Sequence, residues 1–302
     1  ASNNTAIGKE ALYANTTGSS NTALGYQALK ANTTGTRNTA IGYLAMDAVT
    51  GGATQENTAV GFETGGGLTT GTLNTFVGGQ AGSATTTSSY NTAVGQKALR
   101  LNTTGASNTA LGLEALYANT TGTNNTALGK WALKANTTAS YNTAIGMYAL
   151  EHITTGARNI AIGYGSNATS ATADGQCTLG DANISDLRCN DTSISALSDQ
   201  RDKTEIVDSP YGLEFIKTVQ PRQFKWETRD GNVKDGSTRI GFIAQELLTA
   251  CNGENNILDL VLDDNADKLE AKYGNLLPIM VQAIKELSTK NDALVARITA
   301  LE

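Results

Sequence analysis

The stretch "GYQALKANTTGTRNTAIG", residues 25–42, contains one full period of a repeat that fills the first half of the chain. Its last five residues, Asn-Thr-Ala-Ile-Gly, belong to a pentamer that recurs ten times with small variations. The spacing is 17 residues throughout, except for one interval of 19. Ten copies at one period predict a stacked, quasi-one-dimensional repeat body. The pentamers begin at Asn4, Asn21, Asn38, Asn57, Asn74, Asn91, Asn108, Asn125, Asn142 and Asn159.

Each unit has the chemistry of a short strand and two turns. The pentamer carries one branched aliphatic residue between Ala and Gly, and we expect this side chain to point inward. The following glycine suits a corner that needs positive φ, and Asn-Thr-Thr-Gly is typical of a turn. The Ala-Leu step between them supplies a second inward position, as a second strand or as one helical turn.

One unit buries only two or three aliphatic side chains, so we expect several chains to share the interior around a threefold axis. The fold prediction for residues 1–165 is therefore a mainly β rod, either a trimeric parallel β-roll or an interwoven β-helix. Ladders of Asn and Thr would run along about 50 Å of rod. A disordered low-complexity tract is the alternative, and the constant phase of the aliphatics against the glycines argues against it.

The last 105 residues have a different composition. They contain all three prolines and a net charge of −5, against −1 for residues 1–197. We expect residues 166–197 to form a short β connector and residues 198–302 a small α+β domain. Its predicted elements are a helix at 213–219 that ends before Pro221, a strand through Phe224 and Trp226, Asp-Gly turns at 230–231 and 235–236, and a strand at 239–244 that leads into a helix.

The C-terminal residues, about 276–302, show the three- and four-residue steps of a coiled coil. Asn291 would be the single polar residue of the seam, a position that often fixes register. An amphipathic helix packed on its own domain is the alternative. The number of helices in the coiled coil stays open. The seam residues are Leu277, Met280, Ile284, Leu287, Asn291, Leu294, Ile298 and Leu301.

Several classes of function are disfavoured by composition. The sequence pI is about 5.0 and there is no basic run, so neither nucleic acid nor anionic lipid is an expected partner. No apolar stretch is long enough for membrane insertion. Cys177, Cys189 and Cys251 lack metal-ligand spacing and are expected to be reduced, packed thiols. His152 is the only histidine, which disfavours a His-based triad or metal site, and no cofactor is expected.

The charged stretch "SDQRDK", residues 198–203, is where the composition changes. Without histidine, a serine nucleophile needs another base, and a lysine serves if burial lowers its pKa. Ser198 and Lys203 are five residues apart. The same spacing fits a Ser198 that caps a short helix, with Asp199 in its first turn.

Two resemblances extend this interpretation. The repeats of residues 1–165 resemble those of trimeric adhesin heads and phage tail-fibre shafts. The blocks "ALSDQRDKTEI", "YGLEFIKTVQPRQFKW", "RIGFIAQEL" and "YGNLLPIMVQAIKEL" resemble the endosialidase-type C-terminal intramolecular chaperones of phage tail spikes and fibres. That family implies a homotrimer that folds and then cleaves itself between Leu197 and Ser198. Ser198 would be the nucleophile and Lys203 the base, from the same or a neighbouring chain, with Asp199 and Arg201 in possible supporting roles.

The resulting expectation is the C-terminal piece of a phage tail fibre, assembled in the host bacterial cytoplasm and carried in the virion. It would bind a host cell-surface receptor, a glycan or an outer-surface protein, and act as a single-turnover peptidase on itself. The alternative is a polysaccharide-degrading tail spike, although the acidic residues of the repeats are scattered and show no paired spacing. A bacterial surface adhesin, a third option, would need a secretion signal and an anchor.

Overall fold

The computed structural model describes residues 1–52, 55–181, 183–184, 188, 198–225, 238–267 and 269–301. The chain divides into two compact units, residues 1–184 and 185–302. Each unit is described by itself.

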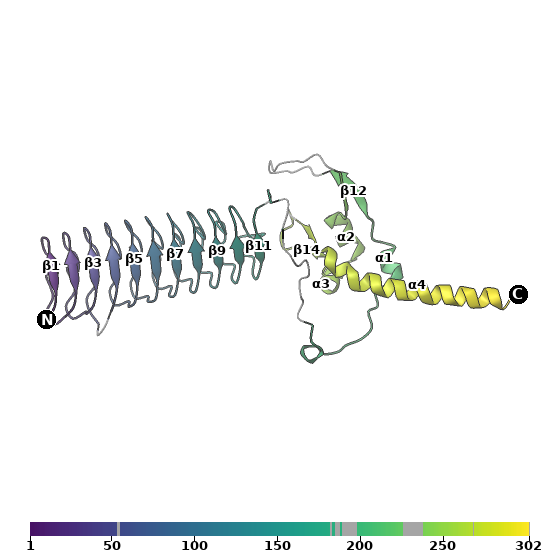
Figure 1. Cartoon of the computed structure of the whole chain (residues 1–302), viewed down its shortest axis with the longest axis horizontal. Helices are drawn as coiled ribbons and strands as arrows, with labels where there is room; N and C mark the ends of the chain where they lie inside the picture. Colours follow the sequence, from purple (N-terminus) through teal and green to yellow (C-terminus); the bar gives the residue numbers. More distant parts are fainter. Residues whose placement is uncertain are drawn as a thin grey trace. The chain divides into compact units, whose positions relative to one another are not determined.

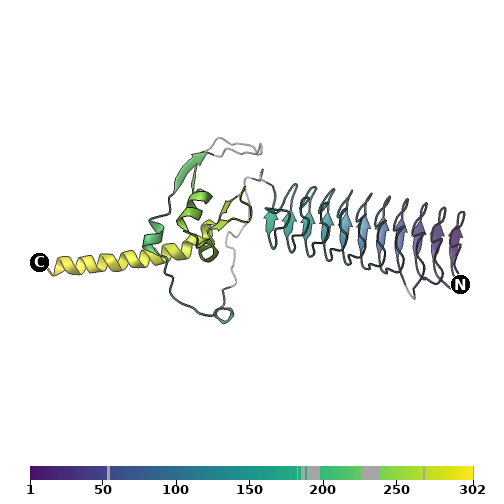
Figure 2. The same cartoon turned by 180° about the vertical axis from the view of Figure 1, so that it is seen from behind.

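The first unit is a parallel β-solenoid, as Figures 1 and 2 show from opposite sides. Each strand is three residues long and pairs in parallel with the strand of the next coil, so that Thr5 lies opposite Thr22 and Thr22 opposite Thr39. The predicted β repeat rod is confirmed. The eleven strands are β1 (Thr5–Ile7), β2 (Thr22–Leu24), β3 (Thr39–Ile41), β4 (Thr58–Val60), β5 (Thr75–Val77), β6 (Thr92–Val94), β7 (Thr109–Leu111), β8 (Thr126–Leu128), β9 (Thr143–Ile145), β10 (Ile160–Ile162) and β11 (Cys177–Leu179).

Neighbouring strands are consecutive in sequence, so one chain closes every coil by itself. Of the two architectures considered, this is the β-roll and not the interwoven helix. The last strand, β11, lies within the segment expected to be a β connector, and it pairs with β10 as a further rung of the solenoid. Its Cys177 is exposed, so the expectation of a packed thiol is wrong at this position.

The branched aliphatic of each pentamer points outward, which corrects the expectation that it would fill the interior. Ala23 is completely buried, whereas Leu24, next to it on β2, is 42% exposed. Because side chains alternate across a strand, only one of the two can face inward, and in these narrow coils it is the alanine. The interior is completed from the opposite wall by Ala28 and Leu29, as expected for the Ala-Leu step.

Left-handed backbone conformations make the corners of each coil. Gly25 has φ of +134°, and a Cβ there would lie 2.4 Å from the carbonyl oxygen of Gly42. Gln27 and Leu29 have φ of 55° and 50°, which costs free energy in a non-glycine residue. The Ala-Leu step is therefore neither a strand nor a helical turn. The interlocked coils offset this cost through backbone hydrogen bonds such as the one from the Leu29 N–H to the Ala45 oxygen, 3.1 Å.

A ladder of buried asparagines runs the length of the solenoid. The Oδ1 atom of Asn91 accepts the backbone N–H of Asn108 at 3.0 Å, and the Nδ2 atom of Asn108 donates to the Gly122 carbonyl at 2.9 Å. The pattern repeats with Asn125 in the next coil. A buried backbone group without a hydrogen-bond partner is costly. The asparagine side chains supply partners for the backbone groups at this corner, which the strands leave unpaired. The expected Asn ladder is confirmed.

Three compensating changes occupy the middle of the core. Phe76 stands on the inner face of β5, where the other strands from β1 to β10 carry alanine, and it is completely buried. Gly65 and Gly82 stand where neighbouring coils have Met46 and Leu99. A Cβ at Gly82 would lie 2.8 Å from ring atoms of Phe76, and one at Gly65 would lie 3.1 Å from it. One ring thus fills the volume that two long side chains occupy elsewhere.

The second unit is a small α+β domain, also as predicted. Its core contains Leu247, Leu260 and Ile279, each at most 5% exposed, together with the buried thiol of Cys251. The predicted Asp-Gly turns and Trp226 lie outside the described residues. The elements are η1 (Gln200–Asp202), α1 (Leu213–Ile216), the antiparallel pair β12 (Arg222–Lys225) and β13 (Thr238–Gly241), α2 (Ala244–Ala250), α3 (Asn255–Leu258), the antiparallel pair β14 (Val261–Leu262) and β15 (Glu270–Ala271), η2 (Tyr273–Asn275) and α4 (Leu276–Thr299).

The 24-residue helix α4 presents two faces. Leu276, Ile279 and Ala283 are buried against the domain. The predicted seam is exposed, with Ile284 at 64% and Leu294 at 54%. The predicted C-terminal helix is therefore present, and its seam has no cover from within the described part of the chain. Among the described residues, no helix is both long and apolar enough to cross a bilayer.

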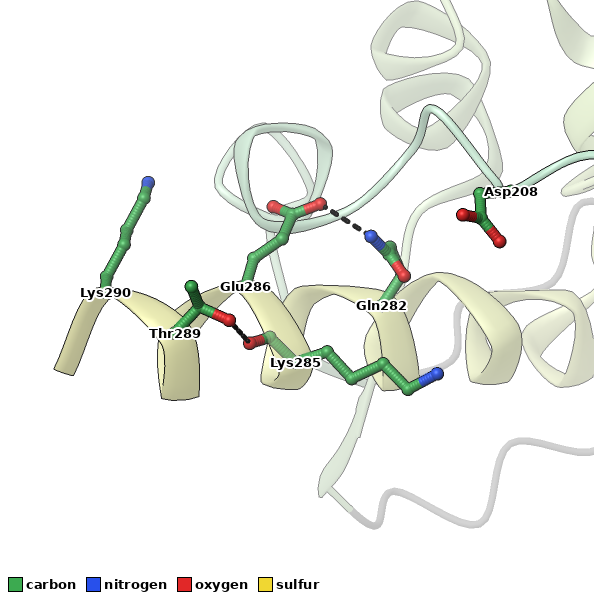
Figure 3. Close-up of a pocket in the computed structure, with 6 residues that line it drawn as sticks. All are labelled: Asp208, Gln282, Lys285, Glu286, Thr289 and Lys290. Carbon is green, nitrogen blue, oxygen red and sulfur yellow. Dashed lines mark hydrogen bonds between the residues drawn. The ribbon is translucent and has the colours of Figure 1, made fainter. Parts of the chain in front are cut away.

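One carboxylate of α4 holds α1 in place. The Oε2 atom of Glu286 accepts the backbone N–H of Leu213 at 2.9 Å, and its Oε1 atom accepts from Gln282 at 3.1 Å. Gln282 and Glu286 border an open depression of about 420 Å³ along α4, shown in Figure 3, which is lined by charged and polar side chains such as Asp208 and Lys285. The carboxylate caps a helix that has no side-chain cap of its own.

We expect Phe76→Ala to lower the free energy of unfolding of the solenoid by about 3 to 5 kcal/mol, because it leaves a cavity between two glycines. Adding Gly65→Leu and Gly82→Leu to that variant restores the composition of the regular coils and recovers most of the loss. The pair of glycine substitutions without Phe76→Ala is the control and should be destabilising through overpacking. Guanidinium unfolding followed by circular dichroism measures all three, and failure of the triple variant to recover would contradict the compensation.

We expect Glu286→Ala to expose the first turn of α1 to exchange. Losing a helix cap costs about 1 kcal/mol, which corresponds to roughly fivefold faster amide exchange over residues 212–217. Hydrogen-exchange mass spectrometry of the full chain measures this. Lys285→Ala, a neighbour on α4 that does not contact Leu213, serves as the control, and equal exchange in the two variants would refute the capping role.

Candidate functional site

The two residues singled out at the change of composition lie in contact. The Nζ atom of Lys203 is 2.5 Å from the Oγ atom of Ser198, a hydrogen-bond distance. The turn of η1 between them, Gln200–Asp202, brings the fifth residue back beside the first. The sequence spacing alone was compatible with many geometries. The structure has one of these geometries, in which the Ser198 hydroxyl and the Lys203 amine are in contact.

The cap of η1 is Asp199 and not Ser198. The Oδ1 atom of Asp199 accepts the backbone N–H of Arg201 at 2.9 Å, and Asp199 has the extended backbone of a cap residue. The alternative in which the Ser198 side chain serves as a cap therefore does not apply. Its hydroxyl is left available to Lys203.

The Arg201 side chain closes the same turn from outside. Its Nε and Nη2 atoms donate to the two oxygens of Asp199 at 3.0 and 2.6 Å. This bond holds the pKa of the Asp199 carboxyl below its ordinary value and raises that of Arg201. Asp199 is therefore ionised at neutral pH and fixes the turn. Both predicted supporting residues lie at the site, in contact with each other.

Ser198 and Lys203 are both exposed in the single chain. A primary amine accepts a proton only in its neutral form, and removal from water is what favours that form. The residues described here do not bury the pair. The predicted scissile bond cannot be placed against it, because Leu197 lies outside the described residues. Asn291 lies exposed on α4, where the predicted seam requires it.

A second feature of the structure was not expected from the sequence. The outward positions of the eleven strands hold only threonine, aliphatic residues and Cys177, with no charged side chain. Exposed fractions include 59% for Ile7, 45% for Leu111 and 53% for Leu179. The alternation of Thr, Ala and an aliphatic residue in each pentamer is the sequence signal for this exposed face. Once the alanine is assigned to the interior, the residues on either side of it must point outward.

The comparisons with known proteins concern the second unit. Residues 198–254 match the family described as chaperone of endosialidase, a peptidase family. No curated protein and no solved structure matches the chain. The match begins at Ser198, the residue in contact with Lys203, and it covers η1, α1, β12, β13 and α2. Residues 198–254 are therefore similar to a chaperone domain of the self-cleaving peptidase type.

Proposed function

We propose that this chain is a segment of a homotrimeric phage tail fibre whose C-terminal domain directs assembly and then cuts itself off between Leu197 and Ser198. The observation that carries the proposal is the 2.5 Å contact between Lys203 Nζ and Ser198 Oγ, at the first residue of the matched domain. The rod would remain in the virion and serve host adsorption. Assembly would take place in the host bacterial cytoplasm.

The proposed chemistry proceeds in two steps. Lys203 Nζ takes the proton of the Ser198 hydroxyl while Oγ attacks the Leu197 carbonyl carbon, and the peptide bond breaks as an ester forms. The proton is returned to the departing Ser198 amine. Water then hydrolyses the ester, giving a Leu197 carboxylate and a free Ser198 hydroxyl. Each chain reacts once.

The exposed face of the solenoid supports association of several chains. At a spacing of about 4.8 Å, the aliphatic residues of the eleven uncharged strands form an apolar strip about 50 Å long, beside a row that is mostly threonine. Soluble monomers rarely expose a continuous apolar surface of that extent. The seam of α4 adds a second uncovered apolar surface in the other unit. We infer that three copies cover both, as the family resemblance implies.

The alternative, a polysaccharide-degrading spike, has one observation in its favour. The pKa of Asp47 is raised by burial and, to a lesser degree, by the charge of Glu63, which are conditions that suit a general acid. Glu10, a carboxylate two coils away along the rod, instead pairs with Lys30 at 2.9 Å, which lowers its pKa. A degradation assay with the N-terminal fragment separates this function from adsorption alone.

We expect the purified chain to yield fragments 1–197 and 198–302 by mass spectrometry. Ser198→Ala and Lys203→Ala should each abolish cleavage, because one removes the nucleophile and the other its base. Lys217→Ala, which removes an exposed lysine that pairs with Glu214, is the control and should cleave normally. An intact wild-type chain after long incubation would rule out the proposed reaction.

Co-expression of the two inactive chains identifies the source of the lysine. If Lys203 acts within its own chain, the mixture stays intact. If it acts on a neighbour, the Lys203→Ala chains are cut wherever a Ser198→Ala chain supplies the base.

We expect Leu111→Asp combined with Leu128→Asp to prevent trimer formation, because it places charges in the middle of the apolar strip. Light scattering of the Ser198→Ala background should give about three times 31.4 kDa for the parent and lower mass for the variant. Thr121→Asp with Thr138→Asp, at exposed corner positions of the same coils, controls for added charge. Equal masses for both variants would refute this face as the interface.

A further inference from the structure

Three aromatic rings form a ladder along one corner of the solenoid. Tyr26 and Tyr43 are stacked with centroids 5.1 Å apart, and Tyr43 and Phe62 with centroids 5.5 Å apart. The rings are within 13° of parallel. Backbone hydrogen bonds keep this corner in register, for example from the Glu63 N–H to the Tyr43 oxygen at 2.8 Å.

The ladder is covered at one end and uncovered at the other. The ammonium of Lys9 lies 5.9 Å from the centroid of the Tyr26 ring. At the other end, the rung after Phe62 is Gly79, and no atom lies within 4 Å of the position a Cβ would occupy there. Phe62 is 50% exposed. The outer face of its ring therefore borders a rung that has no side chain.

The next rung restores a side chain, so the gap is one rung wide. The Gln80 N–H binds the Phe62 oxygen at 2.8 Å and the Lys97 N–H binds the Gly79 oxygen at 2.9 Å, which places the exposed Gln96 one step beyond Gly79. Two steps of about 4.8 Å separate Phe62 from Gln96. Since stacked rings lie about 3.5 to 4 Å apart, this gap of about 10 Å accepts one flat ring between them.

Polar groups flank the gap in the adjoining column. Glu63 and Gln80 follow Phe62 and Gly79, and the Nε2 atom of Gln80 donates to Glu63 Oε2 at 2.9 Å. That bond leaves a carboxylate oxygen and an amide oxygen as acceptors for hydroxyl groups. The negative charge of Glu63 disfavours an acidic ligand. By contrast, Trp131 elsewhere on the rod already has Lys130 and Lys134 at 4.2 Å from its ring.

We propose that the empty rung at Gly79 is a binding slot for one uncharged hexopyranose residue of a glycan. The C–H face of the sugar stacks on Phe62, and its hydroxyl groups bind Glu63, Gln80 and Gln96. This inference rests on the proposed role in host adsorption and names the class of receptor and its site. Saccharide sites are commonly built this way, from an apolar platform and a few polar groups that fix orientation.

The test uses the full wild-type chain after any self-processing, with the methyl glycosides of glucose, galactose, mannose and N-acetylglucosamine as probes. Saturation-transfer NMR should show at least one probe binding through the protons of one ring face. Phe62→Ala should weaken that binding at least tenfold, because it removes the platform. No transfer to any probe would overturn the proposal.

Gly79→Tyr is the decisive variant. It extends the ladder by one ring and fills the slot, at a position where φ lies outside the left-handed region and a Cβ atom would have open space around it. If the sugar occupies the slot, this variant should weaken sugar binding at least tenfold. If the sugar instead binds along the edges of the ladder, the variant should bind as well as wild type or better, and that result would overturn the proposal. Tyr90→Ala, which removes an exposed ring elsewhere, should bind like wild type.

The same samples are analysed by mass for fragments 1–197 and 198–302. Cleavage without sugar binding overturns the slot and leaves the assembly function intact. Sugar binding by an uncleaved chain supports the slot and rules out the proposed self-cleavage.

Discussion

The constraint on which the solenoid depends is the pairing of each backbone group with its equivalent one coil away. The carbonyl of Asn125, for example, accepts the N–H of Thr109 at 2.8 Å, and the Oδ1 atom of Asn108 accepts the N–H of Asn125 itself. Coils of equal length satisfy this pairing without adjustment. The one longer unit, between Asn38 and Asn57, keeps the ladder because Gln55 enters the interior and accepts from the Nδ2 atom of Asn38 at 2.9 Å.

The same regularity creates a difficulty for assembly. Because nearly every coil presents the same threonine and aliphatic residue outward, chains shifted by one coil keep most of their contacts. The interior cannot correct such a shift, since each chain closes its own coils. The alignment must come from a part of the chain that does not repeat. The second unit, with its own core and the exposed seam of α4, has that property.

The sequence predicts the repeat, its period and the two-part organisation, because these depend on spacing alone. It predicts the inward Ala-Leu step but not which residue of the pentamer faces inward. Hydrophobicity favours the branched aliphatic, whereas coil width selects Ala23 and leaves Leu24 outside. The compensation of the large Phe76 side chain by glycines at positions 65 and 82 was also not predicted. These three positions are far apart in the sequence and become neighbours only after the coils stack. At the site, Ser198 and Lys203 came from a family resemblance, and only coordinates show that Asp199 is the cap.

The exposure of Ser198 and Lys203 bears on the order of assembly and cleavage in the proposed reaction. A lysine acts as a base in its neutral form, which removal from water favours. A neighbouring chain that covers the pair would provide the missing desolvation. On the proposed function, cleavage would then follow assembly, because the surfaces that align the chains also complete the site. Removal of the aligning unit afterwards would leave the rod without the part that set its register, so its persistence would depend on the barrier to unfolding and no longer on the ability to refold.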